Sequence, residues 1–323
     1  MVSWLCKEIE KRIINMQLLY MLESIRNPVL DVFFSIVTEF GGEAIFIGVA
    51  IVLFWCLDKK AGYYMLTTGF AGMIVSQFMK ICCRIPRPWV KDPNFTIVES
   101  ARAAATGYSF PSGHTQNAFT VLGTPARWWN NKKLRIFCIV MIVLVGLSRM
   151  YLGVHTPYDV GFSAVMGTIM VFVFYPMFRD MDEKPGRVYA LYAAFIASSA
   201  AFVAYLYLAE FPADLDMENY ESALKHSWEI FACAIGLLLV YHFDRTKLHW
   251  PTAAPLKAQI IKVVVGGGIA LGLKSGLKAP LLALLNGHAS AHAIRYFVMI
   301  LFAGIIWPMT FKWFEAGMPR KEK

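Results

Sequence analysis

Long apolar stretches separated by short polar loops dominate the pattern of this chain of 323 residues. Each stretch approaches the roughly 20 residues that a membrane-spanning helix requires. The expected spans are residues 31–57, 61–83, a third that begins at residue 111, 134–150, 157–178, 187–211, 227–243, 258–275 and 292–311. The pattern predicts an all-α fold, a polytopic transmembrane helical bundle of about nine spans.

The N-terminal segment has a different pattern. Within residues 4–27, apolar side chains recur at helical spacing opposite a charged group at residues 7–12. This pattern predicts an amphipathic helix that lies in the membrane interface. We therefore expect an N-terminal interfacial helix within residues 1–30, a catalytic helical core at 31–180 and C-terminal transmembrane helices at 181–323.

Composition agrees with a membrane protein, because 57% of the residues are hydrophobic, only 16% are charged and the mean hydropathy is +0.50. The expected partner is therefore the lipid bilayer. The net charge of +9 does not indicate nucleic acid, since the basic residues are spread over short loops and form no single stripe. The six cysteines lie mostly in apolar runs without metal-ligand spacing, so we interpret them as small hydrophobic residues. The oligomeric state stays open.

Polar residues that a membrane helix should avoid gather in three short clusters between Lys80 and Asp159. The first, residues 80–88, ends the second span. The second, residues 111–114, opens the third span, and residues 148–159 join the fourth span to the fifth. Counting spans places all three clusters on one side of the membrane. Because ionisable groups are costly within a bilayer and often functional, the clusters predict one site.

Basic residues in the loops predict the orientation of this site. Lysine and arginine are concentrated in the loops opposite the clusters, for example at Lys59, Lys60, Arg127, Lys132 and Lys133. The positive-inside rule places those loops in the cytoplasm. The clusters then face the extracytoplasmic side, which is the exterior, the periplasm or a lumen.

The charges of the clusters indicate a site for a phosphoryl group. Arg87 and Arg149 are permanent cations whose planar forks fit phosphate oxygens, and Lys80 adds a compact charge. Ser112 and the free backbone N–H groups at the start of the third helix extend the anion site, and Gly113 lets a phosphate approach the backbone closely. Such a site stabilises the charge of a phosphoryl transition state.

A histidine can supply the nucleophile, since neutral imidazole attacks phosphorus to form a phosphohistidine that water later hydrolyses. Asp159 follows His155 by four residues, so its carboxylate can reach back to the imidazole and select its tautomer. We therefore assign His155 as the nucleophile. His114 is left to protonate the leaving oxygen and then to activate water.

Each of these residues also has a simpler structural interpretation. Asp159 can complete a capping box with Thr156, and Ser112 can cap a helix. Arg149 can be a snorkelling cation at a helix end, and His114 a packing histidine. Their joint occurrence on one membrane face favours a catalytic site.

Two other motifs stay outside this site. Glu39 and Glu43 flank the Gly41-Gly42 pair that interrupts the first span. Carboxylates in a span are costly and often functional, but they also suit the cap of a helix break, and we assign them no catalytic role. The glycines at residues 266–268 lack the Gly-Lys-Ser/Thr ending of a phosphate loop, so close helix packing is the preferred interpretation.

The spacing of the three clusters resembles a known signature. Lys80-x6-Arg87-Pro88, Pro111-Ser112-Gly113-His114 and Ser148-Arg149-x5-His155-x3-Asp159 resemble the three-part motif of the type 2 phosphatidic acid phosphatase (PAP2) superfamily. The resemblance implies a metal-independent phosphatase with no cofactor and a phosphohistidine intermediate. It assigns nucleophilic attack to His155 oriented by Asp159, acid–base catalysis to His114, and phosphate binding to Lys80, Arg87, Ser112, Gly113 and Arg149. Residues 37–62 resemble the sphingosine-1-phosphate phosphatase branch and its bacterial relatives.

These observations predict an integral membrane lipid phosphatase. The head group of its substrate is expected to lie at a helix end, with the tails in the bilayer. Candidate substrates are phosphatidate, phosphatidylglycerophosphate, polyprenyl pyrophosphate and sphingoid-base phosphate. A phosphotransferase that uses the same phosphohistidine and a phosphatase of a soluble sugar phosphate remain alternatives. A lipid-phosphate binding or transport protein is the non-enzyme alternative. The presence of His114, His155 and Asp159 argues against it, because binding alone needs no nucleophile.

Overall fold

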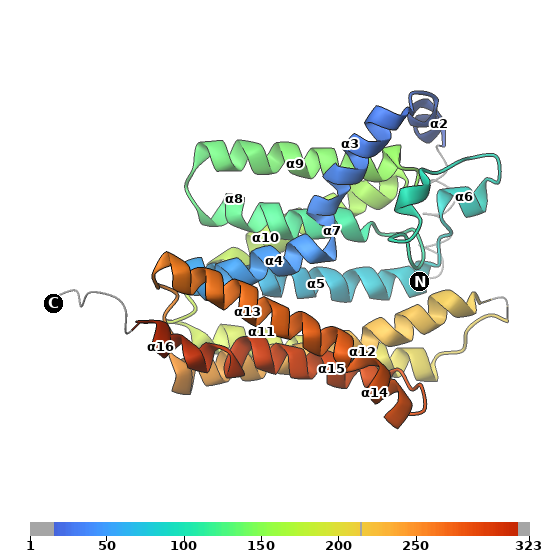
Figure 1. Cartoon of the computed structure of the whole chain (residues 1–323). Coiled ribbons are helices and arrows are strands. Elements are labelled where there is room, and N and C mark those ends of the chain that lie inside the picture. The colour runs from blue at the N-terminus through green and yellow to red at the C-terminus, as the bar shows by residue number, and fades with distance from the viewer. Residues whose placement is uncertain (1–15, 214, 316–323) are drawn as a thin grey trace. The chain divides into compact units, whose positions relative to one another are not determined.

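The computed structural model describes residues 16–213 and 215–315, and these are built from helices with no strand (Figure 1). The first helix of this part is α2 (Gln17–Ser24). The segment of the predicted interfacial helix before residue 16 lies outside the described residues. The prediction of an all-α membrane bundle is confirmed for the part that the structure describes.

Seven helices in the described ranges are long and apolar enough to cross a membrane. They cover Lys59–Lys91, Lys132–Tyr151, Pro157–Arg179, Pro185–Leu208, Met217–Leu248, Leu256–Leu284 and Ser290–Trp313. Their main helices are α5 (Lys59–Cys83), α6 (Pro88–Lys91), α9 (Lys132–Tyr151), α10 (Pro157–Arg179), α11 (Pro185–Leu208), α12 (Met217–Phe243), α13 (Leu256–Gly276), α14 (Lys278–Leu284) and α15 (Ser290–Leu301). The chain is therefore a multi-pass integral membrane protein.

The first predicted span is a bent pair of helices. It contains α3 (Pro28–Thr38), the 3-10 turn η1 (Glu39–Gly41), α4 (Glu43–Val52) and the π turn η2 (Leu53–Leu57). The two halves meet at an angle of 48°, at the predicted interruption, and counting them as one span gives up to eight.

The predicted third span accounts for the remaining difference from nine. It consists of α7 (Gly113–Ala118), the π turn η4 (Phe119–Gly123) and α8 (Thr124–Trp128), which together are too short to qualify as a span. The polar side chains of Thr115, Gln116 and Thr120 are buried in this segment. It is therefore an internal helix, which agrees with the cost of exposing polar side chains to lipid.

The described residues form two compact units, the first of which holds all three polar clusters. It extends to Gly48 and adds Tyr64–Pro176 and Phe211–Ala223. Within it, α3 lies against α9 and η1 lies against α7 (Figure 1). A Cβ atom on Gly41 would overlap the backbone carbonyl of His114, so glycine is required for this close approach.

Helix starts in the first unit follow local sequence signals. Ser112 caps α7, since its Oγ accepts a hydrogen bond from Thr115 N at 3.4 Å. Thr156 and Asp159 cap α10 reciprocally, because Thr156 N donates to Asp159 Oδ2 at 2.7 Å and Asp159 N donates to Thr156 Oγ1 at 3.3 Å. These caps position the residues of the second and third clusters.

The second unit comprises Val49–Tyr63, Met177–Glu210 and the chain from Leu224 onward. Within it, α13 lies beside α15 (Figure 1). A Cβ on Gly266 would overlap the indole of Trp307, whose Nε1 donates to Lys262 O at 3.1 Å. Gly266 thus allows close helix packing, the preferred interpretation of the glycine run.

Candidate active site

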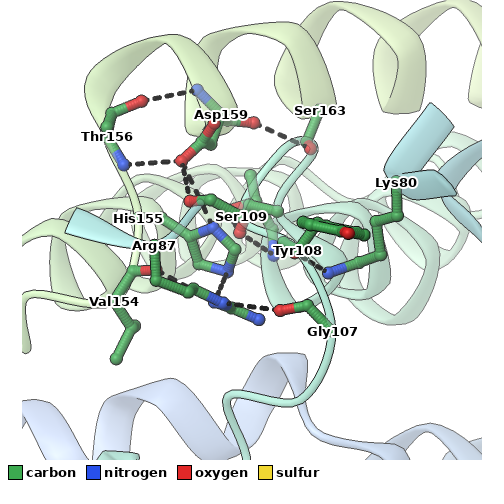
Figure 2. Close-up of polar contacts among 12 residues, drawn as sticks. Lys80, Arg87, Gly107, Tyr108, Ser109, Val154, His155, Thr156, Asp159 and Ser163 are labelled. Carbon is green, nitrogen blue, oxygen red and sulfur yellow. Dashed lines mark hydrogen bonds and ion pairs between the residues drawn. The ribbon is translucent and has the colours of Figure 1, made fainter. Parts of the chain in front are cut away.

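Two of the predicted phosphate-binding cations are held by the backbone of the loop before α7 (Figure 2). Lys80, in the last turn of α5, donates from Nζ to Tyr108 O at 2.5 Å. Arg87 donates from Nε to Gly107 O at 3.1 Å and from Nη2 to Thr106 O at 2.8 Å. Three consecutive carbonyl groups therefore orient two buried cations without neutralising their charge.

Arg149 is the most deeply buried cation of the site, with 1% of its surface exposed. It lies in the last turn of α9, and its Nη1 donates to Thr38 Oγ1 at 2.8 Å. Its Nε and Nη2 are buried and have no hydrogen-bond partner among the described residues. Buried donors without partners are unfavourable, whereas two phosphate oxygens would satisfy both in the bidentate geometry that arginine favours.

His155 is buried in the turn between α9 and α10, next to Arg87 and Asp159 (Figure 2). Its Nε2 lies 3.1 Å from Arg87 Nη1, and its Nδ1 lies 3.5 Å from Asp159 Oδ2. Because a guanidinium has only donors, Nε2 must be the acceptor, and the proton of a neutral ring is on Nδ1, facing the carboxylate. The distance of 3.5 Å is longer than a normal hydrogen bond. Nε2 therefore carries the lone pair.

The surroundings of His155 favour its neutral form. Burial is the main cause that holds the pKa of His155 well below its usual range, and the nearby charges of Arg87, Arg149 and Lys80 act in the same direction. A neutral imidazole is the form that can attack phosphorus.

One oxygen atom of Asp159, Oδ2, both caps α10 and faces the imidazole of His155. Its Oδ2 accepts hydrogen bonds from Thr156 N at 2.7 Å and from Ser109 Oγ at 2.6 Å, and also faces His155. The structural and functional interpretations of Asp159 are thus geometrically compatible.

The second cluster adds the first turn of α7. Ser112 is fully buried, and its backbone N–H donates to Asp159 O at 3.3 Å. No atom lies within 4 Å of the position that a Cβ on Gly113 would take, so there is room for an anion beside the free N–H groups of this turn. His114 is half-buried, makes no side-chain hydrogen bond within the described ranges, and acts electrostatically on His155. The three clusters therefore converge.

Several supporting groups were missed from the sequence. Ser109 holds Asp159, Thr38 holds Arg149, and the carbonyl groups of residues 106–108 hold two cations. A single hydroxyl in a loop or within an apolar helix does not change the hydrophobic periodicity of the sequence. The position of a backbone carbonyl cannot be recognised from residue types at all.

The donor set of the site suits an anion. Three cations surround a neutral histidine, while the one carboxylate is turned toward Ser109, Thr156 and His155. Among the residues that the structure describes, no three histidine, cysteine, aspartate or glutamate side chains are grouped to hold a metal ion. The arrangement can bind a phosphoryl group and present a nitrogen lone pair to it.

Comparisons with known proteins agree with this chemistry. Residues 60–182, which include all the predicted site residues, match the PAP2 superfamily. Residues 228–319 match the PAP2 superfamily phosphatase, transmembrane extension.

Individual relatives are similar to about half of the chain. Undecaprenyl-diphosphatase BcrC of Bacillus subtilis (strain 168) is 32% identical over 168 residues, which are 50% of this chain and 84% of that protein. A probable sphingosine-1-phosphate phosphatase of Dictyostelium discoideum is 29% identical over 176 residues, or 49% of this chain and 40% of that protein. The crystal structure of Aquifex aeolicus LpxE aligns with 49% of this chain and 93% of its own, at 24% identity and a TM-score of 0.44.

Proposed function

The chain belongs to the PAP2 superfamily, and from this premise we propose that it hydrolyses a phosphomonoester or pyrophosphate of a lipid through a phosphohistidine on His155. It is a multi-pass membrane protein of a lipid phosphatase family, and its relatives are phosphatases. The intermediate, the roles of individual residues and the substrate are the proposed parts.

One observation carries the proposal. Arg149 is buried with Nε and Nη2 unpartnered among the described residues, and its positive charge is one of the causes that lower the pKa of His155 and keep it neutral. A tetrahedral phosphoryl group supplies both the acceptors that the arginine lacks and the electrophile that the histidine can attack.

In the first step, His155 Nε2 attacks phosphorus, a nitrogen–phosphorus bond forms, and the bond from phosphorus to the leaving oxygen breaks. Arg87 must release Nε2 at this point, because its Nη1 occupies the lone pair. Bound phosphate competes for that donor. The imidazole becomes cationic, and Asp159 balances the charge.

His114 moves the proton in both steps. Burial and the charges of Arg149, Arg87 and Lys80 lower the pKa of His114 to about 3 in the free site. The negative charge of bound substrate raises this pKa again, and the protonated form donates a proton to the leaving oxygen. Neutral His114 then accepts a proton from water, whose oxygen attacks phosphorus while the nitrogen–phosphorus bond breaks. Inorganic phosphate leaves, and His155 regains its lone pair.

The substrate is proposed to be a lipid, on the basis of the apolar helices around the site and the lipid phosphates in the names of the relatives. Phosphatidate, phosphatidylglycerophosphate, polyprenyl pyrophosphate and sphingoid-base phosphate form the panel to test. The positive-inside distribution of loop charges supports an extracytoplasmic site. A phosphotransferase would share the first step and differ in the acceptor, so stoichiometric release of free phosphate distinguishes the two enzymes.

The test uses the purified full chain in detergent with this panel, scored by phosphate release with and without a chelator. We expect His155→Ala to abolish release, a chelator to have no effect, and His242→Ala, a substitution of an exposed histidine, to leave release unchanged. Full activity of His155→Ala, or strict dependence on an added divalent metal, would contradict the proposal.

A further inference from the structure

Arg26 is a cation of the first unit that lies outside the three polar clusters and that the proposed chemistry leaves without a role. It follows the short helix α2, and its side chain is only 11% exposed. α2 lies against α9, whose end leads to the turn that carries His155. Covering a guanidinium is costly unless its donors are hydrogen-bonded, so the partners of Arg26 indicate what it does.

The guanidinium of Arg26 joins two segments that are far apart in the sequence. Its Nε donates to Tyr151 O at 2.9 Å, at the end of α9. Its Nη1 donates to Thr96 O at 2.9 Å and to Thr96 Oγ1 at 3.1 Å, in the loop between α6 and α7. One side chain therefore ties the start of the catalytic turn to the loop that precedes α7.

Gly153 allows Arg26 to lie close to this turn. Its φ of +81° is in the left-handed region that favours glycine. A Cβ atom at this position would lie 2.7 Å from Arg26 Nη2 and 3.0 Å from Thr96 O. The turn and the arginine thus fit together with no room for a side chain between them.

The other carbonyl groups of the turn are also bound from outside it. Leu152 O accepts from Val98 N at 3.1 Å, in the loop between α6 and α7. Val154 O accepts from Arg87 Nη1 at 2.9 Å, and the same nitrogen lies 3.1 Å from His155 Nε2. A shift of the turn would therefore move the lone pair of His155 relative to the Arg87 guanidinium and to a phosphate bound there.

α2 also holds the loop to which Arg26 binds. Thr96 N donates to Glu23 Oε1 at 2.8 Å, and the Thr96 hydroxyl donates to the same oxygen. The Tyr20 hydroxyl donates to Asp92 Oδ2 at 2.6 Å. Hydrogen bonds to carboxylates are among the stronger ones in proteins. α2 and the loop are thus fixed to each other, which orients Arg26 toward the turn.

A capping role does not account for Arg26. A cation at the end of a helix can bind the free carbonyl groups of the last turn. Among the described residues, however, the acceptors of this guanidinium are Thr96 and Tyr151, which lie outside α2. Its Nη1 is 3.8 Å from Glu23 Oε1, which is longer than a hydrogen bond.

We infer that Arg26 is a positioning residue of the proposed reaction. By binding Tyr151 O and packing against Gly153, it fixes the backbone that carries His155, so that Nε2 is aligned with phosphorus. A displacement of about 1 Å in a reacting group can lower a rate about 10²-fold. The inference rests on the proposed function and adds the segment that follows α2 to its site.

The groups that bind phosphate do not depend on this bridge. Lys80 and Arg87 are bound to carbonyl groups of residues 106–108, and Arg149 is bound to Thr38. Loss of Arg26 should therefore slow attack by His155 and leave the affinity for phosphate unchanged. A general loss of structure would lower both.

The test measures kcat/KM for p-nitrophenyl phosphate and the inhibition constant of inorganic phosphate on the purified full chain in detergent. Arg26→Ala should lower kcat/KM about 10²-fold and leave the inhibition constant unchanged. Arg26→Lys keeps the charge but not the planar fork that binds two segments at once. It should lower kcat/KM about tenfold, the value of one hydrogen bond from a charged group.

Arg135→Ala is the matched control. Arg135 lies in the first turn of α9, at the opposite end of the helix, and its Nε also donates to a backbone carbonyl, that of Ala126 at 3.4 Å. We expect this variant to keep the kcat/KM of wild type. An equal loss in Arg135→Ala would overturn the role of Arg26.

Unchanged kcat/KM in folded Arg26→Ala protein would also overturn the inference, as would a parallel loss of phosphate affinity. Should the melting temperature show that Arg26→Ala is unfolded, Arg26→Lys decides by the same two measurements. Failure of wild type to release phosphate from the lipid panel and from p-nitrophenyl phosphate would instead refute the proposed function.

Discussion

Both units of the chain bury an arginine beside two histidines and a carboxylate, but the carboxylate is used differently. In the second unit, Glu229 Oε1 accepts from Arg295 Nη2 at 3.4 Å, and Oε2 lies 3.0 Å from His226 Nδ1. His292 Nδ1 lies 3.7 Å from the same carboxylate. One acid therefore neutralises the arginine and partners both histidines, as in a structural ion network.

In the first unit, the carboxylate forms no ion pair with Arg149 or Arg87 among the described residues. Asp159 binds Ser109 and Thr156 and faces His155, whereas Arg149 binds only a neutral hydroxyl. The positive charge thus remains available to an anion. Similar residues form a structural ion network or a ligand site, according to where the one acid points.

The largest expected effect is that of His114→Asn, which should lower kcat/KM for a lipid phosphate about 10³-fold by removing the general acid–base. The nitrophenolate leaving group needs no protonation, so p-nitrophenyl phosphate should still phosphorylate His155 in this variant. The expected result is a burst of one nitrophenol per enzyme, followed by slow turnover, measured by stopped-flow absorbance. The matched substitution in the second unit, His226→Asn, should retain wild-type turnover. A comparable loss in His226→Asn would mean that the two histidine clusters do not differ in function.

Arg149→Lys should lower kcat/KM about 10²-fold, because lysine keeps the charge but not the bidentate fork. Arg295→Lys makes the same change in the second unit and should leave kcat/KM unchanged. Kinetics with both variants at a temperature below their melting transitions provide the measurement. Equal losses would remove the distinction between the two arginines.

The change expected in the pH dependence of kcat/KM is smaller than the losses expected for His114→Asn and Arg149→Lys. The pKa of His155 is lowered, so the lone pair persists below the ordinary value of 6.5 and is lost only as the pH falls through the lowered pKa. We expect the acid limb of kcat/KM to lie below pH 6.5 in wild type. Arg87→Gln removes one of the positive charges that lower this pKa, and should move the limb upward by about one unit in the residual activity. If the acid limb of kcat/KM lies at the same pH in Arg87→Gln as in wild type, a group other than His155 controls it.

The smallest effect on activity is expected from Glu229→Gln. It leaves Arg295 buried without a counter-charge, which should reduce the free energy of unfolding by about 3 kcal/mol. The readouts are the melting temperature in detergent, which should fall, and kcat/KM below that temperature, which should not change. Glu210→Gln, at an exposed position of the same unit, is the control for both. Lost activity in a folded Glu229→Gln protein would place the second cluster in the reaction.

The sequence predicted the parts of the site that depend on local signals. The start of α10 at Pro157 was predicted at the observed residue, and the helix predicted to begin at residue 111 begins at Gly113, because a cap and a proline act within one helical turn. Convergence of the three clusters followed from the number of spans between them. The roles of Ser109 and Thr38 could not be predicted, because their partners lie 50 and 111 residues away and contact them only in the folded chain. The π turn within the third predicted span likewise has no signal in apolar periodicity.

Identification of the phosphorylated residue tests the central claim most directly. His114→Asn protein would be incubated with p-nitrophenyl phosphate labelled at phosphorus, quenched during the burst, and mapped by mass spectrometry under alkaline conditions. We expect one acid-labile phosphate per chain on His155, and no label in the double variant that also carries His155→Ala. A protein-bound phosphate on another residue, or a burst without any bound phosphate, would contradict it.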